Sequence, residues 1–136
     1  MASTERALTT ERADTAQRHL ESLVAANESI NLVVLTSGDG MEIAAHPKRN
    51  VGLTQRIAAM SSSIQALAAA LAKESGLASN RCVIIESEAG AVLVLGVASP
   101  GLSASLSVVA SNAVSLGHIL WAARNCCAAL EKSLRR

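Results

Sequence analysis

Residues 33–44 read VVLTSGDGMEIA, and this stretch decides the fold. The β-rich run at residues 31–36 leads into the turn residues SGDG at 37–40, after which a weakly alternating run continues to Ala45. Two glycines flanking an aspartate are typical of a hairpin turn. The sequence therefore predicts an antiparallel hairpin that ends before Pro47.

A first helix is predicted ahead of the hairpin, over residues 13–27. Residues 14–17 resemble a capping box, and apolar side chains such as Leu20 and Leu23 then recur at helical spacing. The preceding residues are polar and lack the apolar segment of a secretory signal. We expect residues 1–12 to form a flexible N-terminal segment.

A clearer helical pattern follows over residues 52–75, and Gly76 suits its C-terminal stop. Its large apolar side chains step alternately by four and three residues, at Leu53, Ile57, Met60, Ile64, Leu67 and Leu71. This heptad stripe could simply pack on a sheet. The flanks are rich in alanine, however, and a second apolar face favours an oligomer interface. We therefore expect residues 57–71 to join two copies of the chain.

The C-terminal half predicts three strands and a last helix. The strands cover residues 82–86, 91–97 and 102–109, and the helix covers 112–134. In the last strand Leu106 and its apolar neighbours alternate with serines, which predicts a sheet with one face in water. The element order is α-β-β-α-β-β-β-α. At 136 residues, the chain is expected to be a single domain, residues 1–136.

Composition argues against several partners. Trp121 is the only aromatic residue, so no stacking platform for bases exists, and a net charge of +1 gives no basic surface for a phosphate backbone. The apolar run at residues 89–98 is about half the ~20 residues of a membrane helix. We expect a cytoplasmic protein with no nucleic-acid partner and no membrane span.

Motifs for catalysis are missing from the sequence. The glycines of the 37–40 turn precede a strand and lack the Gly-Lys-Ser/Thr of a phosphate loop, so the chain is not expected to be a GTPase itself. His19, His46 and His118 have no second ligand at metal spacing. No nucleophile motif is visible either. We expect no enzyme activity, no cofactor and no metal.

The three cysteines are predicted to be small apolar core residues. Their number is odd, and no Cys-x-x-Cys occurs. Cys126 and Cys127 are sequence neighbours, which bridge to one another only with strain. Together with Cys82 they fit the usual buried role of a free cysteine.

From about Leu20 onward, the order of these elements and their motifs resembles the roadblock family of dynein light chains and bacterial MglB-type proteins. That family has a hydrophobic strand, a Ser-x-Asp-Gly turn and a short strand ending in Ile-Ala, as in residues 33–44. A methionine-containing, alanine-rich helix segment matches residues 58–64, and the next two strands match 83–86 and 91–94. Leu116-Gly117 falls early in the last helix, as in the family.

The resemblance implies an α/β (α+β) fold, a five-stranded antiparallel sheet flanked by helices, with the central helix on one face and the terminal helices on the other. It also implies a homodimer joined through the central helix and the third strand. The expected interface residues are Ile57, Met60, Ile64, Ala66, Leu67, Leu71, Cys82 and Ile84. The chain departs from the family in its serines at 61–63 and in the turn at 98–101.

The function implied by the resemblance is a non-catalytic homodimeric adaptor or regulator of a small Ras-like GTPase. Polar positions near the paired helices are the candidates for binding that partner: Gln55, Arg56, Ser62, Ser63 and Lys73. The alternatives are a dimeric small-ligand sensor or scaffold domain, and a weakly related enzyme. A sensor needs a pocket with polar and aromatic anchors, of which the sequence offers few.

Overall fold

A computed structural model describes residues 2–48, 50–99, 102–111 and 115–134. Over these ranges the chain forms eight elements in the predicted order α-β-β-α-β-β-β-α. The elements are α1 (Ala2–Ala26), β1 (Ile30–Ser37), β2 (Glu42–His46), α2 (Val51–Glu74), β3 (Cys82–Ser87), β4 (Gly90–Ser99), β5 (Leu102–Ser111) and α3 (Leu116–Ser133).

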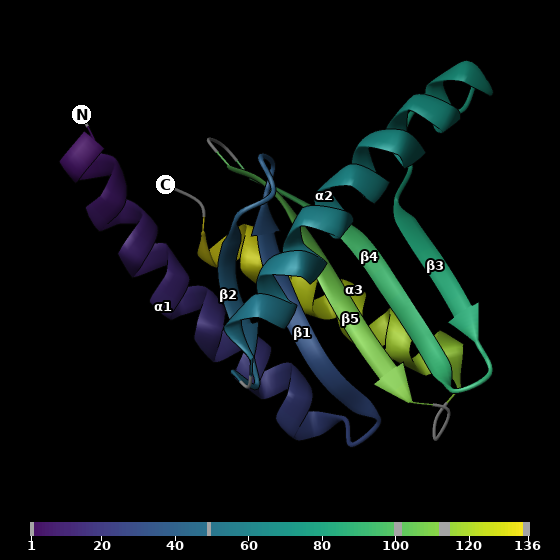
Figure 1. The fold of residues 1–136 in the computed structure, drawn as a ribbon, viewed down its shortest axis with the longest axis horizontal. Coiled ribbons are helices and arrows are strands. Elements are labelled where there is room, and N and C mark those ends of the chain that lie inside the picture. The colour runs from purple at the N-terminus through teal and green to yellow at the C-terminus, as the bar shows by residue number, and fades with distance from the viewer. Residues whose placement is uncertain (1, 49, 100–101, 112–114, 135–136) are drawn as a thin grey trace.

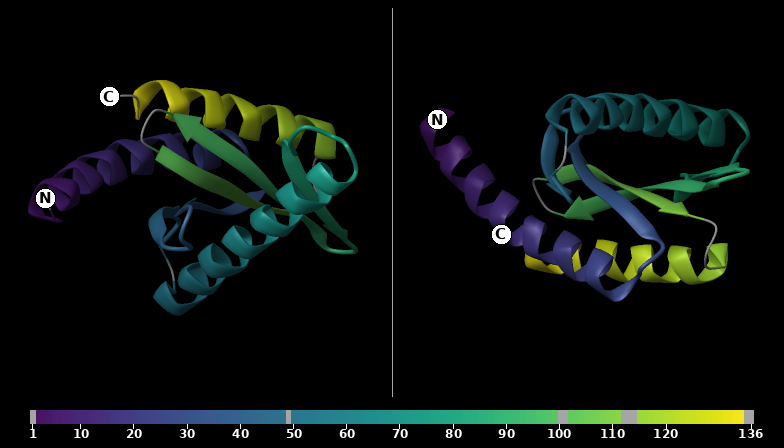
Figure 2. Two further views of the ribbon diagram at one scale, coloured as in Figure 1. Left: turned by 90° about the horizontal axis from the view of Figure 1, so that it is seen from above. Right: turned by 60° about the horizontal axis from the view of Figure 1, so that its bottom comes forward.

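The strands form one antiparallel sheet in the order β2-β1-β5-β4-β3. Helices cover both faces: α2 lies on one face, and α1 and α3 lie on the other (Figures 1 and 2). The expected five-stranded sheet flanked by helices is therefore confirmed. The two edge strands are β2 and β3.

The hairpin of β1 and β2 closes as the sequence predicts. The backbone N–H of Ser37 donates to the carbonyl oxygen of Met41 at 2.8 Å, and the Ser37 hydroxyl donates to the Asp39 carboxylate. Gly40 has φ of +88°, a left-handed conformation that glycine adopts without the Cβ penalty of other residues. The turn thus uses its second glycine for backbone geometry.

Helix α1 is longer than predicted, because it begins at Ala2 and not at Ala13. The segment at residues 2–12, expected to be flexible, continues the same helix, and Asp14 lies inside it instead of capping its start. The range 2–26 contains no glycine or proline and is rich in alanine, glutamate and arginine, which have high helix propensity. The N-terminal part projects beyond the sheet (Figure 2).

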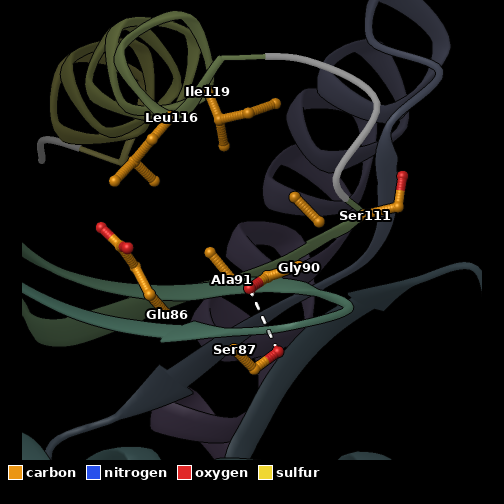
Figure 3. Close-up of a pocket in the computed structure, with 8 residues that line it drawn as sticks. Glu86, Ser87, Gly90, Ala91, Ser111, Leu116 and Ile119 are labelled. Carbon is orange, nitrogen blue, oxygen red and sulfur yellow. Dashed lines mark hydrogen bonds between the residues drawn. The ribbon is translucent and has the colours of Figure 1, made fainter.

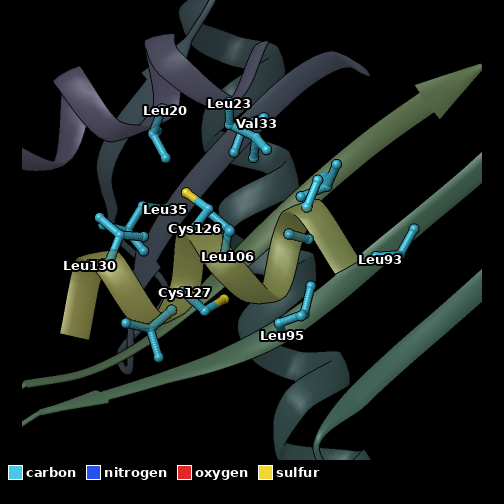
Figure 4. Packing of buried hydrophobic residues seen from close by; sticks show 14 of the residues in the cluster. Leu20, Leu23, Val33, Leu35, Leu93, Leu95, Leu106, Cys126, Cys127 and Leu130 are labelled. Atoms are coloured by element: carbon cyan, nitrogen blue, oxygen red, sulfur yellow. The ribbon is translucent and has the colours of Figure 1, made fainter. Parts of the chain in front are cut away.

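The main core lies between the sheet and the pair α1 and α3 (Figure 4). Leu20 of α1, Leu35, Leu93 and Leu106 of the sheet and Leu130 of α3 have no exposed surface. Each such side chain stabilises the fold by roughly 1.5–3 kcal/mol through removal of apolar surface from water. The predicted apolar face of β5 is confirmed here.

Cys126 and Cys127 belong to this core, with 8% and 7% of their surfaces exposed. Burial raises the pKa of Cys126 to about 11. Burial also raises the pKa of Cys127 to about 12, with a smaller contribution from neighbouring acidic groups. Both are therefore protonated thiols at neutral pH, in agreement with the predicted structural role.

We expect a thiol reagent at pH 8 to label Cys82 first and to leave Cys126 and Cys127 unmodified until the protein is unfolded. Unfolded thiols ionise near pH ~8.5, so above that pH the unfolded state binds fewer protons than the folded state. The free energy of unfolding should therefore fall as the pH rises from about 8.5 towards 11. Replacing both cysteines with alanine should flatten this slope. Fast labelling of Cys127 in the native protein would contradict the assignment.

The opposite face of the sheet is covered by α2 through small and polar contacts. Its buried cluster contains Val34, Ala45 and Ala58. The hydroxyls of Ser61 in α2 and Ser107 in β5 form a hydrogen bond of 2.6 Å. The expectation of a serine face in water is therefore wrong for β5, because α2 lies on these serines.

Both ends of α2 have recognisable caps. The Asn50 side chain accepts a hydrogen bond from the N–H of Leu53 at 3.1 Å, which satisfies a free donor of the first turn. At the other end Gly76 has φ of +76°, and the N–H of Leu77 donates to the carbonyl of Ala72 at 2.8 Å. The predicted glycine stop is confirmed.

Candidate protein-interaction surface

The large apolar side chains of α2 point away from the sheet. Met60, Leu67 and Leu71 are 57%, 71% and 68% exposed, and Leu53 is 40% exposed. The residues that α2 buries are Thr54, Ala58, Ser61 and Ala72. Most of the stripe thus does not pack on the sheet, although Ile57 contacts the buried cluster beneath the helix. Of the alanines expected on the second face, Ala58 and Ala72 are buried against the sheet, whereas Ala59, Ala66, Ala69 and Ala70 are exposed.

Strand β3 continues the uncovered surface at the edge of the sheet. It pairs with β4 alone, so its outer backbone groups have no strand partner among the described residues. Ile84 and Ile85 are 40% and 44% exposed. An edge strand with exposed apolar side chains favours pairing with another chain.

Part of the sheet on the α2 side is also uncovered. Figure 1 shows α2 crossing the sheet towards one end of β3, which leaves the other ends of β3, β4 and β5 open. Ile85, Val92 and Val109, neighbours on adjacent strands, line a depression of about 270 Å³ there. The apolar stripe of α2 and this apolar floor lie on the same side of the molecule. We name the two together the α2–β3 surface.

The predicted dimer residues fall on three sides of the structure. Met60, Leu67 and Leu71 lie on the outward stripe of α2. Ile57 and Ile64 are half-buried at the edge of this stripe, and Ile57 packs against the cluster beneath the helix. Ala66 is exposed on another side of α2, where it lines a cavity with Ser62 and Gln65.

Of the two predicted β3 residues, Cys82 packs against the core beneath α3. Ile84, two residues on, shares its face because side chains alternate along a strand. Val83 and Ile85 are therefore the β3 residues on the α2 side.

The sequence interpretation missed Ile85, Val92 and Val109 as parts of this surface. Their apolar character was visible, but it is equally typical of buried strands. The angle at which α2 crosses the sheet determines which ends of the strands stay uncovered. No local sequence pattern encodes this angle.

The predicted partner-binding residues lie on α2 in two groups. Helical periodicity of 3.6 residues places Gln55, Ser62 and Lys73 along one side, and Arg56 and Ser63 along the outward face next to the stripe. Four of the five are exposed. Ser62 is half-buried, and its hydroxyl donates to the carbonyl oxygen of Gly38 at 3.1 Å.

Two further hollows lie elsewhere on the molecule. The first, of about 140 Å³, lies between the β3–β4 turn and the start of α3, where Glu86 points towards Leu116 (Figure 3). It is smaller than the ~300 Å³ at which ligand pockets begin. The second is a groove of about 270 Å³ between α1 and α3, bordered by Trp121.

Trp121 is 64% exposed beside that groove and stacks on His118 at a ring-centre distance of 6.1 Å. His118 in turn forms a hydrogen bond of 3.1 Å with the side chain of Asn27 in the turn after α1. These contacts join the end of α1 to α3.

The described ranges meet the requirements neither of a metal site nor of a membrane span. The described residues contain no group of three or more His, Cys, Asp and Glu side chains placed to hold a metal ion. Within the same ranges, no helix combines the length and the apolar character needed to cross a bilayer. Contiguous exposed apolar side chains mark interaction surfaces, so the α2–β3 surface is the candidate site.

The fold and the surface define a class: small α/β domains with an antiparallel sheet, one helix on one face and an uncovered helix-and-edge-strand surface. The model of the Roadblock/LC7 domain matches residues 16–110. The chain belongs to the Roadblock/LC7 family, as the sequence resemblance suggested. Among curated proteins, none matches this sequence.

Solved structures of similar fold include MglB of Myxococcus xanthus, with 20% identity, a TM-score of 0.79 and coverage of 91% of this chain and 92% of that one. A Roadblock/LC7 domain from Streptomyces avermitilis has 18% identity and a TM-score of 0.76, with coverage of 87% and 96%. The gliding protein MglB from Thermus thermophilus has 22% identity and a TM-score of 0.71, with coverage of 91% and 89%. At these identities the likeness concerns the fold.

Proposed function

We propose that this protein is a non-catalytic, cytoplasmic homodimer that binds a small Ras-like GTPase as an adaptor or regulator. The observation that carries the proposal is the exposed apolar stripe of α2 beside the open edge strand β3. Three of its large side chains, Met60, Leu67 and Leu71, are each more than half exposed in the single chain. Contiguous apolar surface of this kind marks protein interfaces.

A second copy of the chain fits the α2–β3 surface on physical grounds. Two-fold pairing places the same patch on both partners, so the stripe of one α2 meets the stripe of the other. The sheet floor at Ile85, Val92 and Val109 offers apolar contacts beside α2. Pairing at β3 would satisfy the free backbone groups of the edge. Each of these features supports homodimerisation.

The GTPase partner rests on family membership and on the composite surface of a dimer. The Roadblock/LC7 resemblance implies regulation of Ras-like GTPases, and MglB structures are among those of similar fold. Paired α2 helices would bring two copies of Arg56 and Ser63 onto one exposed face. Such a surface belongs to neither monomer alone, so the proposal makes partner binding depend on the dimer.

We expect the dimer to bind a Ras-like GTPase of the same organism with a preference of roughly tenfold for one nucleotide state. The preference follows because switch segments order differently around the γ-phosphate. Affinities for the GTPase loaded with GDP or with a non-hydrolysable GTP analogue can be measured by calorimetry. Arg56→Glu should weaken binding, and Arg18→Glu, on the exposed side of α1 across the sheet, is the matched control.

The outcomes separate the parts of this function. Equal affinity for both nucleotide states would indicate a scaffold and not a regulator. Absence of binding in either state would refute the GTPase partner and leave the fold and the dimer unaffected. GTP turnover by the protein alone, abolished by a point substitution in it, would contradict the non-catalytic role.

A further inference from the structure

A cavity of about 340 Å³ lies between α2 and the ends of β4 and β5. Its volume is within the range of ~300–1,000 Å³ that small-molecule sites occupy. Ser62, Gln65, Ala66 and Ala69 of α2 form one wall. These residues are on a different side of the helix from the stripe of Met60, Leu67 and Leu71, so the cavity is separate from the α2–β3 surface.

The floor of the cavity contains a largely buried serine whose hydroxyl forms no hydrogen bond with the described residues. Ser105 of β5 lines the cavity and is only 7% exposed. Its neighbour on the same strand face, Ser107, forms a hydrogen bond with Ser61, whereas Ser105 forms none with the described residues. Thr36 of β1, opposite Ser105 in the sheet register, is fully buried and its hydroxyl also has no partner.

Polar side chains that are largely buried usually have a hydrogen-bond partner. A group bound in the cavity would supply one for Ser105. The hydroxyl is part of the lining, so a ligand there could both donate to it and accept from it.

Amide groups at the entrance add further hydrogen-bonding capacity. The Asn80 side chain donates to the Gln65 carbonyl oxygen at 2.9 Å, which orients both amides. The Gln65 amide nitrogen has no hydrogen bond of its own in the described ranges and lies above Gly96 of β4. A Cβ at Gly96 would be 3.5 Å from that nitrogen, so any longer side chain there would extend into the cavity.

We propose that this cavity binds a small, neutral polyhydroxyl compound. Among the described residues that line it, none is charged and none is aromatic. A charged ligand would lose its hydration without a counter-ion, and a flat aromatic ligand would find no stacking partner. Hydroxyl groups match the serine hydroxyls and amides of the lining, since each can donate and accept.

The test is a titration of the isotope-labelled full-length protein, followed by amide NMR, with glycerol, erythritol, xylitol and glucose as probes. Polyols also stabilise proteins by exclusion from their surfaces, so a thermal shift alone would not identify a site. We expect saturable shifts for at least one probe at Gly38, Gly96 and the side-chain amides of Gln65 and Asn80. Glutamate and adenosine should give none.

Three variants localise the binding. Gly96→Leu fills the cavity and should abolish the saturable shifts, while Gly96→Ala adds a Cβ in ordinary contact and should retain them. Ser105→Ala should weaken binding by roughly threefold to tenfold, as expected for one neutral hydrogen bond. It should not lower stability, because it removes a polar atom that has no partner.

Saturable shifts that survive in Gly96→Leu would overturn the proposal, as would the absence of saturable shifts with all four probes up to tens of millimolar. The second result would assign the cavity to water alone. If Gly96→Leu did not fold, Ser105→Ala would decide: unchanged affinity would refute the role of the buried hydroxyl. None of these outcomes depends on dimerisation or on a GTPase.

Discussion

Leu67→Asp should convert the homodimer to a monomer. Leu67 is 71% exposed in the single chain, so the substitution leaves the fold of the monomer intact. In a two-fold dimer it buries two unpaired carboxylates at the paired α2 helices. At about 3 kcal/mol for each buried charge, the dissociation constant should rise by about four orders of magnitude. Light scattering coupled to size-exclusion chromatography measures the change in mass.

Ala66→Asp is the matched control on the same helix. The sequence analysis expected Ala66 in the interface, but in the structure Ala66 lines the cavity of about 340 Å³ between α2 and the ends of β4 and β5. We therefore expect this variant to remain a dimer. A wild-type protein that is monomeric at micromolar concentration would refute the proposed dimer. Dissociation by Ala66→Asp and not by Leu67→Asp would show that the interface lies on the other side of α2.

Gly90→Ala should cause a large loss of stability at the start of β4. A Cβ added at Gly90 would be 2.0 Å from the carbonyl oxygen of Ala110 and 3.1 Å from the Cα of Ser111, both backbone atoms of β5. The hydroxyl of Ser87 donates to the Gly90 carbonyl at 3.2 Å, which further fixes this backbone (Figure 3). Adjacent strands can accommodate the methyl group only by separating.

We expect the free energy of unfolding to fall by about 3 kcal/mol and the melting temperature by roughly 10 °C. Gly117→Ala is the control, because a Cβ there meets nothing within 4 Å and alanine favours the helix. That variant should gain about 0.5–1 kcal/mol. Both should be compared at one protein concentration, since dimerisation shifts apparent stability. Equal stability of Gly90→Ala and the wild type would contradict the close strand approach.

Local sequence patterns were sufficient to predict the elements of this fold. Alternation in β5, the glycine turn at 37–40 and the apolar repeat of α2 each report on backbone geometry within a few residues. The start of α1 was predicted wrongly, because the sequence signal for a helix boundary is weak there. The capping-box residues at 14–17 are polar and compatible with both a helix start and a helix interior, and α1 continues through them to Ala2.

The α2–β3 surface was predicted less completely than the fold, because the apolar repeat of α2 is compatible with two orientations of the helix on the sheet. The stripe of α2 and its alanine-containing face have the same period, so the pattern could not show which of them faces the sheet. Ser107, Ala45 and Ala58 have small side chains and lie between α2 and the sheet, so the helix can approach the sheet closely along this face. The larger side chains, Leu67 among them, then point outward.

The sequence alone was enough to predict the order of the elements and the hairpin, because both depend on interactions between near neighbours. These two features also suggested that the chain belongs to the roadblock family. The tertiary structure determined which face of α2 is exposed and that Ile85 lies beside Val92 on the α2 side of the sheet. It also determined that Ser105 lines a cavity beneath α2. It also decided that Gly90 has no room for a side chain. These properties arise from strand register and helix crossing, which bring together residues far apart in the chain.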